Sequence, residues 1–207
     1  MSVTIVEHPL VARHLTVLRD HRTPSPVFRE TLVDVGSMLL YEALRDLRIG
    51  DVPVATPLEE TVGARLADEI VVIAILRAGL GMVEGALRLV PEARVGHLGL
   101  YRDETELTPV HYYESLPDGI PGAEVVVMDP MLATGGSAVH ALERLKRAGA
   151  QRLRFVCLLA APEGIAAVEA AHPEVPITCA VVDRELDGRG FIRPGLGDAG
   201  DRIFGTE

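Results

Sequence analysis

The stretch that decides the fold of this chain is Val125-Val126-Val127-Met128-Asp129-Pro130-Met131-Leu132-Ala133-Thr134-Gly135-Gly136-Ser137. It begins with an apolar, β-branched run that ends at the carboxylate of Asp129, which is typical of a buried strand in a parallel sheet. The glycines let the backbone turn tightly, and Thr134 and Ser137 place hydroxyl groups beside free amides at the start of a helix. This combination predicts an anion pocket suited to a phosphate group.

Asp129 indicates a second kind of ligand group beside the phosphate. Its negative charge would repel a phosphate, so a neutral donor such as a sugar hydroxyl is the better partner. A phosphate pocket with a hydroxyl acceptor at its mouth predicts a site for a ribose 5-phosphate. An ordinary strand-to-helix turn would explain three or four of these residues, but not the whole string.

Composition narrows the class of protein. The chain has 207 residues, of which 48% are hydrophobic and 24% charged, as expected for one globular domain with an ample core. Its net charge of −10 disfavours a nucleic-acid partner. The longest strongly apolar run, residues 70–76, is too short to span a bilayer, so no membrane partner is expected. Cys157 and Cys179 lack metal-type spacing and are predicted to be buried thiols in a reducing cytoplasm.

Strands and helices alternate along most of the chain. Buried strands are predicted at 70–76, 94–100, 125–128, 153–160 and 177–182. Between them lie a helix that ends at about Leu89 and helices at 136–148 and 164–171. This order predicts an α/β fold with an open, mostly parallel sheet flanked by helices. Residues 1–207 are expected to form a single domain.

Four segments lie outside this alternation. Residues 1–50 are predicted to be a helical N-terminal extension with helices at 9–20 and 27–48, the second burying Leu32, Val35, Leu39, Ala43 and Leu47. Residues 51–57 are Pro-rich and extended. Residues 104–118 form a charged hairpin or flap outside the core. Residues 184–207 form a glycine-rich tail whose shape must come from a ligand or a neighbouring loop.

Arg77, Arg102 and Asp129 each follow a predicted strand directly. Ligands of parallel sheets bind at the carboxyl ends of the strands, so these three residues should meet in one crevice. A single arginine at such a position is more often part of a surface ion pair. Three strand ends with phosphate-compatible chemistry favour a ligand site instead. The seven histidines have no zinc-type spacing, and no catalytic metal site is expected.

The loop 129–137 resembles the phosphoribosyl-diphosphate loop of type I phosphoribosyltransferases, and in detail that of the uracil phosphoribosyltransferase family. Further matches are Leu76-Arg77-Ala78-Gly79-Leu80-Gly81-Met82, Tyr101-Arg102-Asp103-Glu104, Pro109-Val110-His111-Tyr112-Tyr113 and Pro194-Gly195-Leu196-Gly197-Asp198-Ala199-Gly200-Asp201-Arg202. The resemblance implies a pentosyltransferase of pyrimidine salvage, which joins uracil to 5-phospho-α-D-ribose 1-diphosphate and releases UMP and diphosphate.

The same resemblance implies roles for individual residues. Asp129, Pro130, Met131, Leu132, Ala133, Thr134, Gly135, Gly136 and Ser137 would hold the ribose and its 5-phosphate. Arg77 and Arg102 would face the diphosphate and, with Asp129, carry catalysis. Ile192, Gly197, Asp198 and Ala199 would hold uracil in a C-terminal hood, and Asp198 would also lie near phosphoribosyl diphosphate. The flap is expected to close over this substrate.

The resemblance also implies partners. Magnesium would arrive with the diphosphate rather than at a site of the protein, GTP would be a candidate allosteric activator, and the chain would form a homodimer or a higher homo-oligomer. Two rivals remain: a regulator that keeps the fold but binds RNA, and transfer to another nucleobase such as a purine. The negative charge disfavours the first. Ala133 and the short glycine tail disfavour the second, because Ala133 stands where purine enzymes of the superfamily carry an acid near the base. Pro130 is a further departure from the wider superfamily, whose loop commonly begins with two acids.

Overall fold

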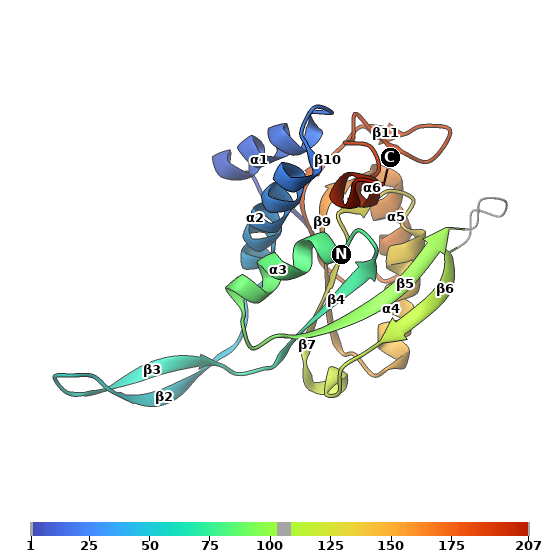
Figure 1. The fold of residues 1–207 in the computed structure, drawn as a ribbon. Coiled ribbons are helices and arrows are strands. Elements are labelled where there is room, and N and C mark those ends of the chain that lie inside the picture. The colour runs from blue at the N-terminus through green and yellow to red at the C-terminus, as the bar shows by residue number, and fades with distance from the viewer. Residues whose placement is uncertain (1, 103–108, 207) are drawn as a thin grey trace.

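The protein, described here by a computed structural model covering residues 2–102 and 109–206, is built around an eight-stranded sheet (Figure 1). The strands follow the order β1-β10-β9-β7-β4-β5-β6, and β8 pairs with β9. All pairings are parallel except that of β6 with β5. The strand bounds are Val3–Ile5 (β1), Ile70–Leu76 (β4), Arg94–Arg102 (β5), Pro109–Ser115 (β6), Glu124–Met128 (β7), Met131–Leu132 (β8), Arg152–Ala160 (β9) and Ile177–Val182 (β10). The predicted open, mostly parallel sheet is confirmed.

Helices cover both faces of this sheet (Figure 1). Val72 and Val126 pack in one core with helices α1, α2, α3 and α6, while Val71 and Ile73 pack in a second core with α4 and α5. The central strands are apolar at nearly every position, because their side chains are buried on both faces of the sheet. The helix bounds are Pro9–Arg19 (α1), Ser25–Ala43 (α2), Leu80–Leu89 (α3), Gly136–Arg147 (α4), Pro162–Ala171 (α5) and Ala199–Phe204 (α6).

The N-terminal segment belongs to the sheet as well as covering it. Strand β1 extends the sheet by pairing with β10, although the sequence shows only a short apolar stub there. Helix α2 buries its predicted face but ends at Ala43, five residues before the predicted end at Arg48. Leu47 lies beyond the helix, partly buried against the core. Arg154 donates a hydrogen bond to the carbonyl oxygen of Ala43 at 2.7 Å, which satisfies one acceptor at the helix end.

A two-stranded hairpin projects from the body of the protein (Figure 1). It consists of β2 (Ile49–Ala55) and β3 (Glu60–Leu66). The sequence predicts an extended segment at 51–57 but misses β3, because most side chains of both strands are exposed and leave no apolar alternation to detect. Leu58 at the tip is 96% exposed and Val62 is 68% exposed.

Part of the predicted flap is a strand of the main sheet. Residues 104–108 lie outside the described residues, whereas 109–115 form β6, which pairs antiparallel with β5. The pairing shifts register between Gly99 and Leu100, as in a β-bulge. The hairpin is therefore present, and its second strand is the sheet edge.

Side chains of α1 hold the glycine-rich tail in place. Arg19 of α1 forms a bidentate ion pair with Asp183, at 2.6 and 3.0 Å. The Asp183 side chain is only 4% exposed and also accepts a hydrogen bond from the amide of Gly195 at 3.0 Å. Arg19 in turn donates to the carbonyl oxygen of Gly195 at 2.9 Å. One buried carboxylate therefore joins the first helix, the end of β10 and the tail.

Further arginine contacts fix the rest of the tail, which comprises β11 (Glu185–Leu186), β12 (Ile192–Arg193) and α6. Arg202 donates to the carbonyl oxygens of Leu196 and Asp20 at 2.9 and 2.7 Å, and its guanidinium lies 4.4 Å from the ring centre of Phe28. Arg29 of α2 donates to the carbonyl oxygen of Ile203 at 2.7 Å. The neighbouring element that shapes the tail is thus the pair of N-terminal helices.

We expect Asp183→Asn to destabilise the protein, because Arg19 loses its charged partner. Breaking a buried ion pair costs about 3–5 kcal/mol, and roughly 2–3 kcal/mol is expected here because Arg19 is partly exposed and asparagine keeps one acceptor. The melting temperature should fall by roughly 4–12 °C in calorimetry. The control Glu185→Gln removes the exposed ion pair with Arg184 and should leave the melting temperature nearly unchanged. Equal shifts for the two variants would contradict a structural role for Asp183.

Candidate active site

A cavity of about 950 Å³ lies at the carboxyl ends of the central strands, between the loop after β7 and the tail. It brings together residues that are far apart in the sequence. They are Ala78, Asp129, Met131, Ala133, Arg189, Gly190, Phe191, Ile192, Gly197, Asp198, Ala199 and Gly200. The candidate nucleobase residues Ile192, Gly197, Asp198 and Ala199 therefore share one cavity with Asp129.

The loop 129–137 is tied to the neighbouring strand β9. The carbonyl oxygen of Pro130 accepts hydrogen bonds from the amides of Leu158 and Leu159, both at 3.0 Å. Residues 131 and 132 then pair with β9 as strand β8. The backbone turns at Gly135, whose φ is +84°, and α4 begins at the next residue. A β-carbon on Gly135 would lie 2.7 Å from that of Ala167, so this position also excludes a side chain.

The start of α4 provides the predicted setting for an anion. The first amides of a helix have no intrahelical acceptor and carry the positive end of the helix dipole. Thr134, Gly136 and Ser137 surround this start and are half-buried, which leaves them accessible to a ligand. The loop can therefore bind a phosphate group through amides and hydroxyls, without a lysine.

Asp129 sits at the edge of this loop in a poorly solvated position. Its carboxylate accepts one hydrogen bond, from the amide of Met131 at 3.3 Å. Burial raises the pKa of Asp129 to about 7, while the Met131 amide lowers it and the charge of Asp198 adds a smaller increase. A carboxylate with so few donors around it has free acceptor capacity for the hydroxyls of a sugar.

The facing wall of the cavity includes the segment 197–200, in which only Asp198 has a side chain larger than a methyl group. Gly197 has a φ of +85° and carries no side chain, and Ala199 is 3% exposed. Asp198 begins α6 as its N-cap, because its Oδ1 accepts a hydrogen bond from the amide of Asp201 at 3.0 Å. Peptide groups can therefore approach a planar ligand edge closely at this wall.

The two candidate arginines lie at the same sheet edge as Asp129. Arg77 follows β4 directly, and β4 is flanked by β5 and β7. The Arg77 side chain is 55% exposed and pairs with Asp201, outside the cavity lining. Arg102 is the last residue of β5, which extends two residues beyond the predicted end at Leu100. The side chain of Arg102 lies outside the described part of the structure.

Sequence reasoning missed three lining residues, Arg189, Gly190 and Phe191. They belong to the turn between β11 and β12, two strands of two residues each that carry no readable pattern. Their position directly before Ile192 was the only signal available. Among residues 2–102 and 109–206, no cluster of three or more His, Cys, Asp or Glu side chains is placed to hold a metal ion. No helix in these ranges is both long and apolar enough to cross a membrane.

The fold and the site define the class of protein. A hypoxanthine-guanine phosphoribosyltransferase from Bacillus anthracis superposes with a TM-score of 0.53 at 17% sequence identity, covering 78% of this chain and 83% of that chain. At this identity the similarity establishes the fold alone, which is that of the type I phosphoribosyltransferases.

Sequence comparison resolves the family within this class. The uracil phosphoribosyltransferase family model matches residues 5–206, and the chain belongs to this family. The uracil phosphoribosyltransferase of Salinibacter ruber is 56% identical over 205 residues, covering 99% of this chain and 98% of the relative. A solved structure from Aquifex aeolicus is similar throughout, with a TM-score of 0.95, 40% identity and 99% coverage of both chains. The resemblance indicated by the sequence motifs is confirmed.

The poorly solvated carboxylate of Asp129 predicts a pH-dependent stability. Its pKa is raised from 3.8 to about 7 in the folded protein, so between these values the folded state binds more protons than the unfolded state. The stability contributed by burying the neutral carboxyl is complete below about pH 4 and is lost as the pH rises through 7. Asparagine does not ionise, so Asp129→Asn should raise the melting temperature relative to the wild type more at pH 8 than at pH 5.

Thermal unfolding of both proteins across this pH range checks the expectation. The matched control is Asp51→Asn, which makes the same chemical change at an exposed position of the projecting hairpin. A wild-type-minus-variant difference that stays constant from pH 5 to pH 8 would show that Asp129 is not held in a desolvated environment.

Proposed function

We propose that this protein transfers the phosphoribosyl group of 5-phospho-α-D-ribose 1-diphosphate to uracil, giving UMP and diphosphate. One observation carries the proposal: Asp129 of the phosphate-binding loop and the backbone wall at 197–199 line the same cavity. The cavity can thus hold a sugar phosphate and a planar base side by side. Membership of the uracil phosphoribosyltransferase family supports the same substrates.

In the proposed reaction the bond between the sugar C1 and the diphosphate oxygen breaks, and the diphosphate leaves with the electron pair. Positive charge develops on the ribose ring, and N1 of uracil forms the new bond to C1 while its proton passes to the departing diphosphate or to water. The amides of the loop at 134–137 hold the 5-phosphate, and the Asp129 carboxylate accepts hydrogen bonds from the ribose hydroxyls. Fixed groups of this kind stabilise the transition state without rearranging.

The departing diphosphate requires positive charge, for which Arg77 and Arg102 at the ends of β4 and β5 are the proposed partners. Besides Asp129, the loop offers no carboxylate that could accept a proton from uracil. Pro130 and Ala133 stand where other enzymes of the superfamily carry acids. Magnesium is proposed to enter with the diphosphate substrate and, when bound, to neutralise charge on the leaving group. The chain's own contribution is to orient the two substrates and to exclude water.

Recognition of uracil is proposed to rest on the backbone of the tail. Uracil presents two carbonyl acceptors and one imide donor, a pattern that amides and one carbonyl can match. Cytosine replaces one acceptor with an amine and would leave a buried amide unpaired, at a cost of about 1–3 kcal/mol. A site that reads hydrogen bonds rejects such an analogue more strongly than a site that reads shape alone.

Three wider features belong to the proposal. The exposed apolar side chains of the projecting hairpin, among them Ile49, Leu58 and Val62, support assembly into a homodimer or a higher homo-oligomer. The two free, buried cysteines support a cytoplasmic location. Activation by GTP is proposed from the family resemblance. Light scattering of the purified chain tests the oligomeric state, and titration of its activity with GTP tests the activation.

An assay of the common nucleobases with phosphoribosyl diphosphate tests the function. We expect turnover with uracil and 5-fluorouracil and poor turnover with cytosine and thymine. The release of diphosphate measures the turnover. Comparable activity with a purine or with cytosine would reject the proposed substrate.

Asp129→Asn should lower kcat/KM by about 30- to 1,000-fold, equivalent to about 2–4 kcal/mol, because the charged acceptor for the ribose hydroxyls is lost. Steady-state kinetics at pH 8, where the wild-type carboxylate is ionised, provides the measurement. Unchanged kcat/KM would remove Asp129 from the site.

Ala199→Val should raise the KM for uracil more than the KM for phosphoribosyl diphosphate, because two added methyl groups crowd the base wall. The control Ala166→Val adds the same atoms at an exposed position of α5 and should leave both constants unchanged. Normal uracil kinetics in Ala199→Val would mean that this wall does not contact the base.

A further inference from the structure

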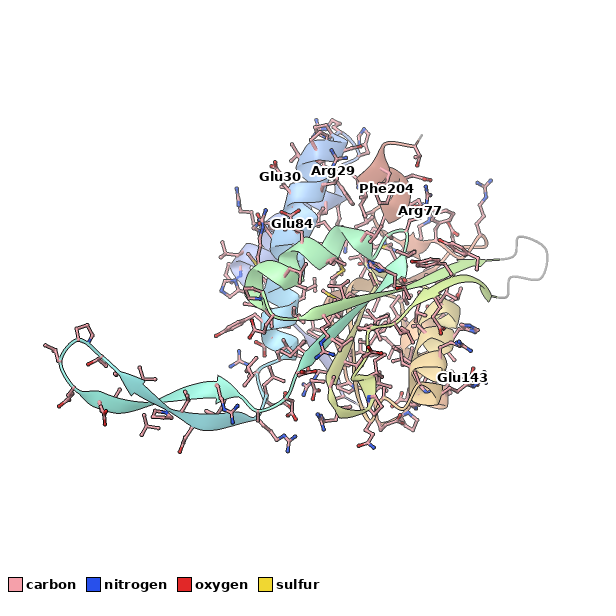
Figure 2. All side chains as sticks on the ribbon, turned by 60° about the horizontal axis from the view of Figure 1, so that its bottom comes forward. Arg29, Glu30, Arg77, Glu84, Glu143 and Phe204 are labelled. Atoms are coloured by element: carbon pink, nitrogen blue, oxygen red, sulfur yellow. The ribbon has the colours of Figure 1, made fainter. Side chains whose placement is uncertain are left out.

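Arg77 is held by the C-terminal helix α6, although 122 or more residues separate them in the chain. Its guanidinium Nη2 lies 3.1 Å from Oδ1 of Asp201. The guanidinium carbon also lies 5.9 Å from the ring centre of Phe204, and Figure 2 shows these two side chains next to each other where the end of β4 meets α6. Arg77 is thus bound from two sides by one short helix.

The carboxylate of Asp201 is itself oriented. Its Oδ1 accepts a hydrogen bond from the hydroxyl of Thr206 at 2.5 Å, in addition to the contact with Arg77. The Asp201 side chain is 25% exposed, whereas that of Arg77 is 55% exposed. Asp201 is therefore the fixed member of the pair, and Arg77 is the member that can reach a ligand.

The pairing leaves most of the guanidinium free. An arginine has five N–H donors, and within the described part of the chain Arg77 uses Nη2 alone for a hydrogen bond. The remaining donors can bind the oxygens of a diphosphate while the contact with Asp201 persists. A long side chain that is already held in place loses less conformational freedom when the ligand binds.

The same helix reaches the nucleobase end of the cavity. The amide of Asp201 donates to Oδ1 of Asp198, which lines the cavity together with Ala199. Arg29 of α2 holds the other end of α6 through the carbonyl oxygen of Ile203. Helix α6 thus begins at a residue of the base wall, is held by Arg29 near its end, and connects this wall with the arginine beside β4.

We propose that Asp201 is a positioning residue, which holds Arg77 at the end of β4 for contact with the diphosphate. This inference rests on the proposed function, because it assigns the residue that acts through Arg77 at the same site. The opposite relation, in which the carboxylate merely neutralises Arg77 and competes with the ligand, predicts tighter diphosphate binding when Asp201 is removed. The two relations therefore predict opposite changes in diphosphate affinity when Asp201 is replaced.

The test compares Asp201→Asn, Asp201→Glu, Arg77→Ala and the double variant in two measurements. Calorimetry gives the affinity for inorganic diphosphate, and steady-state kinetics gives KM and kcat for each substrate. Asp201→Asn should weaken diphosphate binding and lower kcat/KM for phosphoribosyl diphosphate by about tenfold each, within the range of couplings between contacting residues. The KM for uracil should change by less than about twofold, and Asp201→Glu should recover part of the loss.

The double variant separates positioning from a structural role. In the Arg77→Ala background, Asp201→Asn should cause no further loss, because the group that it positions is absent. The matched control is Glu84→Gln, which removes an exposed ion pair with Arg88 and the same charge from α3. This control should behave as the wild type in both measurements.

Several results would overturn the inference. These are unchanged or tighter diphosphate binding in Asp201→Asn, losses that multiply in the double variant, or a uracil KM that rises in step with the loss, which would indicate a collapsed base wall. A wild-type protein that binds diphosphate but makes no UMP would reject the proposed function, while the binding cycle would still decide the role of Asp201. Absence of diphosphate binding by the wild type would overturn the inference about Asp201, while formation of UMP would still decide the proposed function.

Discussion

The arrangement of the site depends on the buried ion pair between Arg19 and Asp183. The tail at 184–207 is rich in glycine and contributes few apolar side chains, so hydrophobic packing alone does not define its path. The Asp183 carboxylate supplies a fixed point, because it binds the Arg19 guanidinium and the amide of Gly195 together. A carboxylate in this position is tolerated only because its charge and its acceptors are satisfied. The base wall is therefore a product of the first helix as much as of the tail.

The parallel sheet accounts for the other half of the site. Strand β4 lies between β5 and β7, so the residues that follow these strands come to one edge. Strand β9 adds the hydrogen bonds that hold the phosphate-binding loop, through Leu158 and Leu159. Backbone amides and glycines then create a binding site for an anion in a protein whose net charge is −10. Local geometry, rather than overall charge, is what suits this loop to the proposed phosphorylated substrate.

Asp129 and helix α6 give this site its chemical character. The low solvation that raises the pKa of Asp129 also leaves its oxygens free for a ligand. Helix α6 has six residues, yet it contacts the cavity through Asp198 and Ala199 and the arginine at β4 through Asp201. The proposed sites for the base and for the diphosphate are therefore joined by one short helix, which gives a physical route for the two substrates to influence one another.

The sequence by itself determined the sheet, the turn from strand to helix at 129–137 and the family. Uninterrupted β-branched runs such as 70–76 and 125–128 are typical of strands covered on both faces, and Thr134 to Ser137 indicate a helix start at which amides are free. These are local signals, carried by residues close together in the chain. Strand β3, the end of α2 and the turn at 189–191 were not predictable, because exposed or very short segments leave no hydrophobic period.

Only the tertiary structure decided how the tail meets the loop and which partners the arginines have. Arg19 pairs with Asp183 and Arg77 with Asp201, over separations of 164 and 124 residues. The sequence does not indicate which partner a charged side chain will have, because ion pairs depend on position in space and on burial rather than on periodicity. The lining of the cavity, the raised pKa of Asp129 and the hold of α6 on Arg77 all follow from such long-range contacts.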